Sequence, residues 1–499
     1  MSDSEDAALS ISTESEGPHS FARRFTSNAA WMLIGQVGAK AASFAFFVIV
    51  ARGLGIHEYG YFTFTISFVP LFLMFGMWGL EITVVREVAR NRERVSELFA
   101  SGFIMRIVLG VVALGLAAAF APLFLDGAEA YTTLAIVGLA LFVDELSGFV
   151  GTVFKAFERM KFFSLVILAN RVLSALLAFV AFVFNGSIVV LSLTYLVGST
   201  GAFVVAWILL KKRFPTTRLK DFQARLAVKL LRDGIPLGVA GVLNMAVFRI
   251  DFVLLQILNG SRAVGMYGAA YRFLESFLFV AWTLTSVVLP RMSRQGAGSG
   301  AARTHGFTLA LILSFYLPLA VGSWFLAPWA VTLLFSERYE PAAQAVPWLT
   351  SAAVFYGIAY LSRVTVIGVG GRQRVVWIAA LALAVNVVAN LLVIPRYGFT
   401  GAAITTFATE VLEAALLVRL VVQVTGSTPF HRALVVPVAA AAVMGAVLWA
   451  TGADAAGGLL LGVCVYGISI LILGRLIAPA EAARLLQLFR GSKSSEVRP

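Results

Sequence analysis

Stretches of about 20 mainly apolar residues recur along the whole chain, and this recurrence constrains the fold more than any other feature. A helix of about 20 apolar residues crosses the hydrocarbon core of a bilayer. We count about fourteen such stretches, at 28–51, 59–85, 101–125, 131–154, 162–184, 188–210, 235–258, 266–290, 306–334, 344–367, 375–394, 401–424, 433–450 and 458–477. Composition agrees, because 60% of the 499 residues are hydrophobic and only 13% are charged. The sequence therefore predicts an all-α, polytopic membrane protein.

The basic residues between the spans predict the orientation of the chain. With the N-terminus placed inside, the inner segments carry 27 Lys and Arg residues and the outer loops carry 4. Cytoplasmic loops are enriched in Lys and Arg, so both termini are predicted to be cytoplasmic. The formal net charge of +13 follows from this bias. It indicates contact with anionic lipid and argues against nucleic acid as a partner.

A long basic segment, 211–234, separates a first group of six spans from a second group of six, which two further spans follow. The pair Tyr59-Gly60 follows the first span and Tyr267-Gly268 follows the seventh, at the same topological point. Parallel repeats of this kind build transporters with a site between two lobes. The predicted organisation is listed here: a disordered tail (1–24), an N-terminal lobe (25–210), a linker with an amphipathic helix or a plain tether (211–234), a C-terminal lobe (235–424), two further spans (425–478) and a cytoplasmic tail (479–499).

Cations occupy the middle of several predicted spans, where each charge costs roughly 2.5–3.5 kcal/mol. Lys40 lies 19 residues before Tyr59, and Arg249 lies 18 residues before Tyr267. Each lobe therefore carries a cation at similar depth in its first helix, an arrangement that an anionic substrate needs. We predict that Lys40 and Arg249 bind the substrate, with Arg171 and Arg272 as helpers. The alternative is that Arg249 only neutralises Asp251, although two residues apart they point to different helix faces.

Buried carboxylates are candidates for binding a coupling ion, H⁺ or Na⁺. The candidates are Asp144, Glu145, Asp251, Glu410 and Glu413. Packing against arginines is the alternative for the last two, and Arg272 can pair with Glu275 three residues away. Asn386 and Asn390 stack on one helix face. Five charges nearer the inner ends are expected to be structural and to reach the interface with long side chains: Glu81, Arg106, Arg363, Arg419 and Arg475.

No cofactor, metal or catalytic residue is expected from the sequence. It has no G-x-x-x-x-G-K-[ST] phosphate loop, so ATP hydrolysis by this chain is not expected. The four histidines are expected to lie in tails or loops, apart from one another.

Four short segments resemble a known family of transporters. They are Arg52-Gly53-Leu54-Gly55 with Tyr59-Gly60; Gly79-Leu80 with Arg86-Glu87; Ile250-Asp251 with Val264-Gly265-Met266-Tyr267, Ala270 and Pro290; and Ile394-Pro395-Arg396-Tyr397-Gly398 with Gly401-Ala402-Ala403. In order and position they resemble motifs of the polysaccharide transporter (Wzx-type oligosaccharide flippase) family of the MOP superfamily, which includes the multidrug MATE exporters and the lipid II flippase. Ile56 departs from the pattern, where a proline is common.

The resemblance implies a V-shaped body of two six-helix lobes plus two C-terminal helices, and a function in polysaccharide biosynthesis. The implied substrate is a polyprenyl-diphosphate-linked oligosaccharide, moved from the inner to the outer leaflet of the cell membrane by alternating access. Implied partners are membrane lipids, a coupling ion, a polysaccharide polymerase and glycosyltransferases. Two alternatives stay open: a MATE-like exporter of small molecules, which favours an acidic cavity, and a membrane-embedded glycosyltransferase or polymerase, which favours a large outer loop.

Overall fold

The computed structural model describes residues 18–479 except 75–77, 215, 297, 370, 429–431, 453–454 and 478. The described chain is helical almost throughout, as predicted. Eight of its helices are long and apolar enough to cross a membrane. The predicted tails at residues 1–17 and 480–499 lie outside the described residues, and α1 (Pro18–Gly53) begins within the segment predicted to be disordered.

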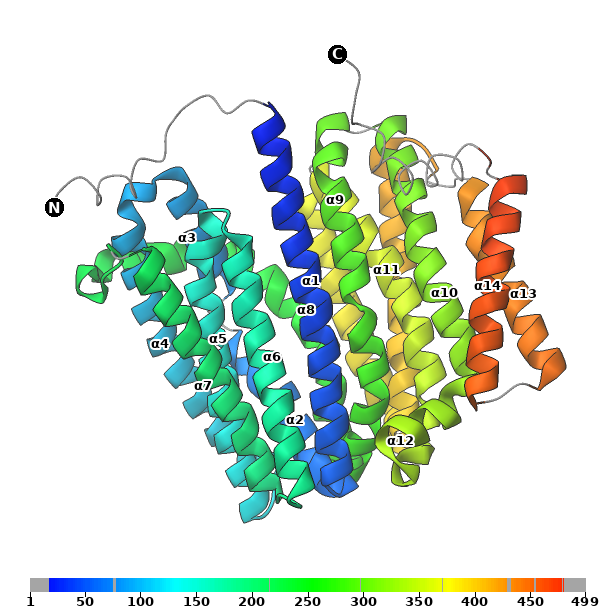
Figure 1. Cartoon of the computed structure of the whole chain (residues 1–499), viewed down its shortest axis with the longest axis horizontal. Helices are drawn as coiled ribbons and strands as arrows, with labels where there is room; N and C mark the ends of the chain where they lie inside the picture. Colours follow the sequence, from blue (N-terminus) through cyan, green and yellow to red (C-terminus); the bar gives the residue numbers. More distant parts are fainter. Residues whose placement is uncertain are drawn as a thin grey trace.

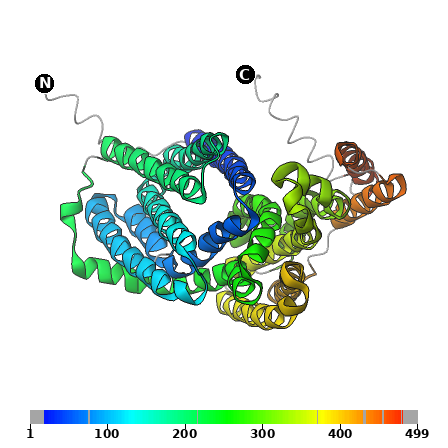
Figure 2. The ribbon, with the colours of Figure 1, turned by 90° about the horizontal axis from the view of Figure 1, so that it is seen from below.

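The helices form two lobes side by side, with α1 between them (Figures 1 and 2). The first lobe consists of α1, α2 (Ile56–Leu73), α3 (Trp78–Arg90), α4 (Val95–Phe120), α5 (Ala128–Ala156), α6 (Met160–Val183) and α7 (Ile188–Arg213). The second consists of α8 (Ala224–Phe277), α9 (Phe279–Gln295), α10 (Ser299–Phe335), α11 (Val346–Gly368) and α12 (Arg372–Thr425). At its outer flank lie α13 (Val435–Thr451) and α14 (Ala455–Ile477). These two lobes and two extra helices confirm the predicted fold class.

Several predicted spans are joined or divided differently from the sequence-based assignment. α12 contains two predicted spans, joined at Gly398 (φ 57°). α8 contains the seventh and the first part of the eighth, joined at Gly260 (φ 76°), and the eighth continues in α9. A positive φ suits glycine because it has no Cβ, so the chain reverses there without an extended loop. The second predicted span is instead divided into α2 and α3.

The linker between the lobes packs on the first lobe. Its 3₁₀ turn η4 (Leu219–Asp221) lies against α4, where the Ser96 hydroxyl donates to an Asp221 carboxylate oxygen at 2.5 Å. The backbone N–H of Gln223 donates to Ser101 Oγ at 3.1 Å. The amphipathic helix predicted within 211–234 begins at Ala224 and continues into the seventh predicted span.

Glycines allow the helix backbones of the two lobes to approach closely. A Cβ on Gly60 of α2 would overlap the backbone carbonyl of Ser261 in α8, and a Cβ on Gly265 would overlap the carbonyl of Ile56. Gly268 packs on Thr63 in the same interface. Small residues let membrane helices approach closely. The two Tyr-Gly pairs of the repeat therefore sit at the contact between the lobes.

Candidate functional site

Three of the four predicted substrate-binding cations, Lys40, Arg249 and Arg272, lie near one another between the lobes. Lys40 on α1 interacts electrostatically with Glu275 and with all three predicted arginines, Arg171, Arg249 and Arg272. The Arg272 guanidinium lies over the Phe47 ring of α1 at 3.8 Å from the ring centroid, a distance typical of a cation–π contact. Arg249 and Arg272, in the seventh and eighth predicted spans, therefore lie near the first predicted span, which carries Lys40 and Phe47.

Two arginines share one carboxylate in this cluster. Arg249 Nη2 donates to Glu275 Oε1 at 2.9 Å, and Arg272 Nη1 donates to Glu275 Oε2. Arg249 is therefore paired with Glu275 and not with Asp251, so the alternative in which it only neutralises Asp251 is wrong. In this cluster, four buried guanidinium nitrogens have no hydrogen-bond partner among the described residues: Nε and Nη1 of Arg249, and Nε and Nη2 of Arg272. The cluster thus holds more positive than negative charge and unused donors.

Tyr59 of the first Tyr-Gly pair lies next to this cluster. Its side chain is fully buried and close to the Arg272 guanidinium, but its hydroxyl makes no hydrogen bond of normal geometry to a described residue. The motif was singled out for its position in the repeat, and its proximity to the cations was not predicted.

The fourth predicted cation, Arg171, is neutralised inside the first lobe. Its Nη2 donates to Asp144 Oδ2 at 2.8 Å, and its Nη1 donates to the Tyr195 hydroxyl at 3.1 Å. Asn170 donates to the other Asp144 oxygen at 2.6 Å. Arg171, predicted to help bind the substrate, and Asp144, a candidate for binding the coupling ion, therefore form one ion pair.

Other charges of the first lobe are paired as well. Glu145 accepts from Arg106, and Glu81 accepts from Lys155 Nζ at 2.7 Å. Arg106 was expected to reach the interface, but its side chain is 1% exposed. A carboxylate in the same lobe holds it inside, so that expectation was wrong. In the second lobe Arg363 likewise pairs with Glu413.

Asp251 lies in a separate polar group inside the second lobe. Its carboxylate is fully buried and accepts from the Tyr267 hydroxyl at 2.9 Å, from Thr406 Oγ1 at 2.7 Å and from Asn390 Nδ2 at 3.4 Å. Asn390 Nδ2 also donates to Asn386 Oδ1 at 2.9 Å. The partners that the described residues give this carboxylate are all neutral. Tyr267 and Thr406 were not predicted, although Tyr267 belongs to the second Tyr-Gly pair.

The residues that contact Asp251 also bring further oxygen atoms to this polar group. The side-chain oxygen of Asn390 is buried and has no hydrogen-bond partner among the described residues. Thr406 Oγ1 also contacts the carbonyl oxygen of Ala402 at 3.0 Å. Carboxylate, amide, hydroxyl and carbonyl oxygens are ligands that hard cations use, and the carboxylate alone can take a proton.

Glu410 and Glu413, predicted together, have different surroundings. Glu413 pairs with Arg363, whereas Glu410 Oε2 is buried without a hydrogen-bond partner among the described residues. The histidines also depart from expectation, because His57 lies in α2 and His305 in α10. His305 Nδ1 is 2.9 Å from Thr365 Oγ1. Within the described residues no cluster of His, Cys, Asp or Glu forms a metal site.

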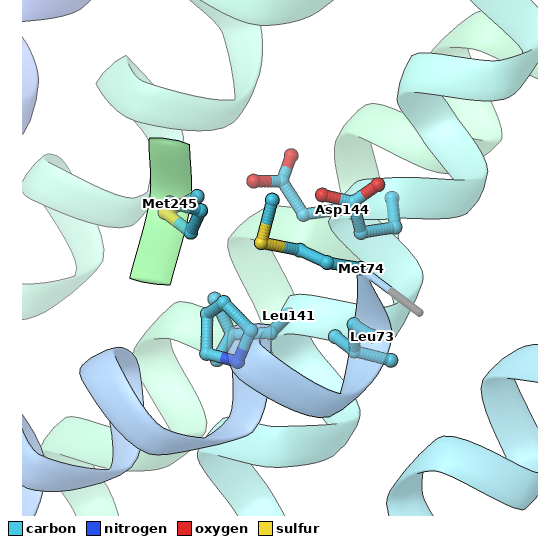
Figure 3. Close-up of a pocket in the computed structure, with 7 residues that line it drawn as sticks. Leu73, Met74, Leu141, Asp144 and Met245 are labelled. Atoms are coloured by element: carbon cyan, nitrogen blue, oxygen red, sulfur yellow. The ribbon is translucent and has the colours of Figure 1, made fainter. Parts of the chain in front are cut away.

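A small cavity of about 40 Å³ lies between the lobes, next to the carboxylates of Asp144 and Glu145 (Figure 3). It is lined by Pro70, Leu73, Met74, Leu141, Asp144, Glu145 and Met245. Met245 comes from α8 of the second lobe and faces Asp144 across the cavity. A volume of this size holds about three waters, so this cavity does not accommodate a sugar in the present conformation.

Two solved transport proteins share this fold. The inward closed conformation of the lipid II flippase MurJ superposes with a TM-score of 0.74 at 16% identity, covering 89% of this chain and 98% of that chain. An inward-facing MATE multidrug transporter superposes with a TM-score of 0.65 at 15% identity, covering 79% of this chain and 97% of that one.

The family profile described as "Polysaccharide biosynthesis protein" matches residues 25–295, and the chain belongs to this family. An uncharacterised membrane protein of Methanocaldococcus jannaschii is 23% identical over 78% of this chain and 82% of its own length. The EPS I polysaccharide export inner membrane protein EpsE of Ralstonia solanacearum is 23% identical over 74% of this chain and 86% of its own. The predicted resemblance is thereby confirmed.

Proposed function

We propose that this chain is a flippase that moves a polyprenyl-diphosphate-linked oligosaccharide across the cell membrane for polysaccharide biosynthesis. Membership of the polysaccharide biosynthesis family supports the substrate class, as does the similarity to a protein named for polysaccharide export. The observation that carries the proposal is the arginine pair at Glu275, with its unused buried donors.

A diphosphate matches these donors chemically. Its oxygens are hydrogen-bond acceptors and carry negative charge, and arginine binds such groups through two parallel N–H bonds. Arg249 and Arg272 together outnumber the single carboxylate of Glu275, so an anion restores the charge balance. Lys40 supplies a third cation from the other lobe. An anion bound here draws the lobes together, and a site between lobes is what alternating access requires.

The proposed coupling ion binds at Asp251. A carboxylate surrounded by neutral donors lacks the countercharge that a buried ion needs, so binding H⁺ or Na⁺ there stabilises this group. The hydroxyl oxygens of Tyr267 and Thr406, 2.9 Å and 2.7 Å from the carboxylate, can also ligate a metal cation, which favours Na⁺. Because Arg249 and Asp251 are two residues apart on α8, occupancy of one site can move the helix that carries the other.

A MATE-like exporter of small molecules is the alternative function. A multidrug resistance protein NorM of Burkholderia vietnamiensis is 31% identical over 40% of this chain and 45% of its own length. Excess positive charge at Lys40, Arg249 and Arg272 disfavours cationic drugs, so the anionic lipid-linked substrate is preferred.

Replacing Arg249 by Ala tests the proposal. In proteoliposomes with a fluorescent polyprenyl-diphosphate-N-acetylglucosamine, Arg249→Ala is expected to abolish flipping at normal protein yield. Arg249→Lys should restore part of it, because charge survives but the bidentate geometry does not. Arg419→Ala is the matched control, since Arg419 is exposed on α12. Full flipping by Arg249→Ala would remove the proposed role of the cluster.

The proposed orientation, with both termini cytoplasmic, has its own test. In a Cys464→Ser background, single cysteines at positions 57, 262 and 338 should react with an impermeant maleimide added outside intact cells. A cysteine at position 218, in the basic linker, should react only after the cells are opened. Labelling of position 218 from outside would reverse the orientation.

A further inference from the structure

We propose that Trp282, with Tyr356 and Tyr360, forms a stacking site for the sugar ring attached directly to the diphosphate. This inference rests on the proposed function and assigns a second part of the same substrate. It concerns an aromatic group on α9 and α11 that the charge-based analysis did not include.

The Trp282 ring lies between the lobes. Lys40 Nζ on α1 is 5.9 Å from its ring centroid, whereas Trp282 itself belongs to α9 of the second lobe. A Trp at the level of the headgroups commonly anchors a helix in the interface. Lys40 is near the middle of its predicted span, so contact with Lys40 places Trp282 away from that level.

The second lobe fixes the orientation of this ring. Its indole N–H donates to the hydroxyl of Tyr356, which is 3% exposed. The Tyr360 ring lies beside both, at centroid distances of 6.4 Å from Trp282 and 5.9 Å from Tyr356. With its one polar atom satisfied, Trp282 is still 40% exposed. The exposed part is therefore an apolar, preoriented ring surface.

Two links place this surface near the proposed diphosphate site. Phe248, next to Arg249 in α8, packs edge-on against Tyr356 at 5.4 Å between centroids. Lys40 contacts Trp282 and interacts with Arg249 and Arg272. The first sugar of a lipid-linked glycan begins one bond beyond the diphosphate. When the arginines hold the diphosphate, that sugar lies within reach of Trp282.

The chemistry of the surface favours a sugar over the prenyl chain. A pyranose ring has an apolar C–H face that stacks on an aromatic ring, and hydroxyls around its edge. The surface combines an aromatic face with a phenol hydroxyl on Tyr360 and an ammonium group on Lys40. A prenyl chain gains nothing from the two polar groups, whereas sugar hydroxyls can bond to both.

The test compares a polyprenyl diphosphate with and without one sugar. Affinities for the purified protein are measured for the bare lipid and for its glucose, galactose and N-acetylglucosamine forms. Wild type should bind at least one sugar form about three- to tenfold more tightly than the bare lipid, the range for aromatic stacking. Trp282→Leu should lose this preference while binding the bare lipid as wild type does. Trp282→Phe should retain most of it.

Trp377→Leu is the matched control, because Trp377 is 70% exposed on α12, and it should behave as wild type. Equal affinities of wild type for all four lipids would overturn the stacking site. So would a Trp282→Leu protein that keeps the sugar preference, or one that loses affinity for the bare lipid, which would indicate the prenyl chain instead. Failure of the diphosphate site is distinguishable, because Arg249→Ala would then bind the bare lipid as tightly as wild type.

Discussion

The two lobes repeat one helical plan but treat their buried charges differently. In the first lobe, Asp144 pairs with Arg171, Glu145 with Arg106, and Glu81 with Lys155. In the second lobe, one carboxylate serves two arginines, and Asp251 is held by neutral groups. A paired charge is already neutralised by its partner inside the protein. An unmatched charge gains further stabilisation when a ligand of opposite charge binds.

This difference indicates a division of labour. Burying a charge costs several kcal/mol unless it is paired, so the first lobe's pairs make it a balanced frame. The unmatched groups of the second lobe are where an anion and a cation can each contribute binding energy. The first lobe takes part mainly through α1, whose Lys40 and Phe47 reach across to the second.

The largest expected effect is on the stability of the first lobe. Glu145→Ala removes the carboxylate that pairs with Arg106, whose side chain is 1% exposed, and breaking a buried pair costs about 3–5 kcal/mol. Glu145→Ala should therefore lower the thermal midpoint and the yield of purified protein. The reverse change, Arg106→Ala, should cost less, because Glu145 is 40% exposed.

A double variant, Arg106→Met with Glu145→Leu, should recover most of the lost stability, since apolar replacements of buried pairs are well tolerated. Arg94→Ala, at an exposed ion pair, is the control and should change the midpoint little. A stable Glu145→Ala protein that had lost its ion dependence would instead put coupling in the first lobe.

The next effect is on transport and separates Asp251 from Asp144. Asp251→Asn removes the charge that the proposed ion neutralises, so flipping should lose its dependence on a Na⁺ or H⁺ gradient. Typical coupling free energies between two binding sites correspond to about a 5- to 150-fold change in ligand affinity. Asp144→Asn should keep the gradient dependence, and should lower the thermal midpoint because Arg171 loses its carboxylate. The comparison of the lobes fails if the two variants exchange these behaviours.

The sequence was sufficient to predict the all-helical, polytopic fold and its two lobes, and it placed Lys40 and Arg249 at similar depth in their helices. Hydropathy and the Tyr-Gly repeat are local sequence patterns. The approximate position of a residue along its predicted span follows directly from them. Partner choice could not be predicted, because it depends on how helices rotate and pack. Arg106 and Glu145 are 39 residues apart, and nothing in their separation shows that they meet. Thr406 and Tyr267 similarly reach Asp251 from α12 and from the second half of α8.

The smallest expected effect distinguishes two neighbours on α12. Glu413→Gln leaves Arg363 without its carboxylate and should cost about 1–3 kcal/mol, measured as a lower thermal midpoint. Glu410 has a buried oxygen without a partner, so Glu410→Gln replaces a poorly satisfied acid by a neutral amide of the same shape. Its midpoint should stay within about 0.5 kcal/mol of wild type or rise.

The same two variants also show whether Glu410 is a structural or an ion-binding carboxylate. If Asp251 alone takes the coupling ion, Glu410→Gln should flip substrate with the gradient dependence of wild type. If Glu410→Gln is stable but loses that dependence, the second lobe holds two unmatched carboxylates that share the ion. Glu413→Gln is the matched control for this measurement, because its carboxylate is already neutralised by Arg363 and should contribute to stability only.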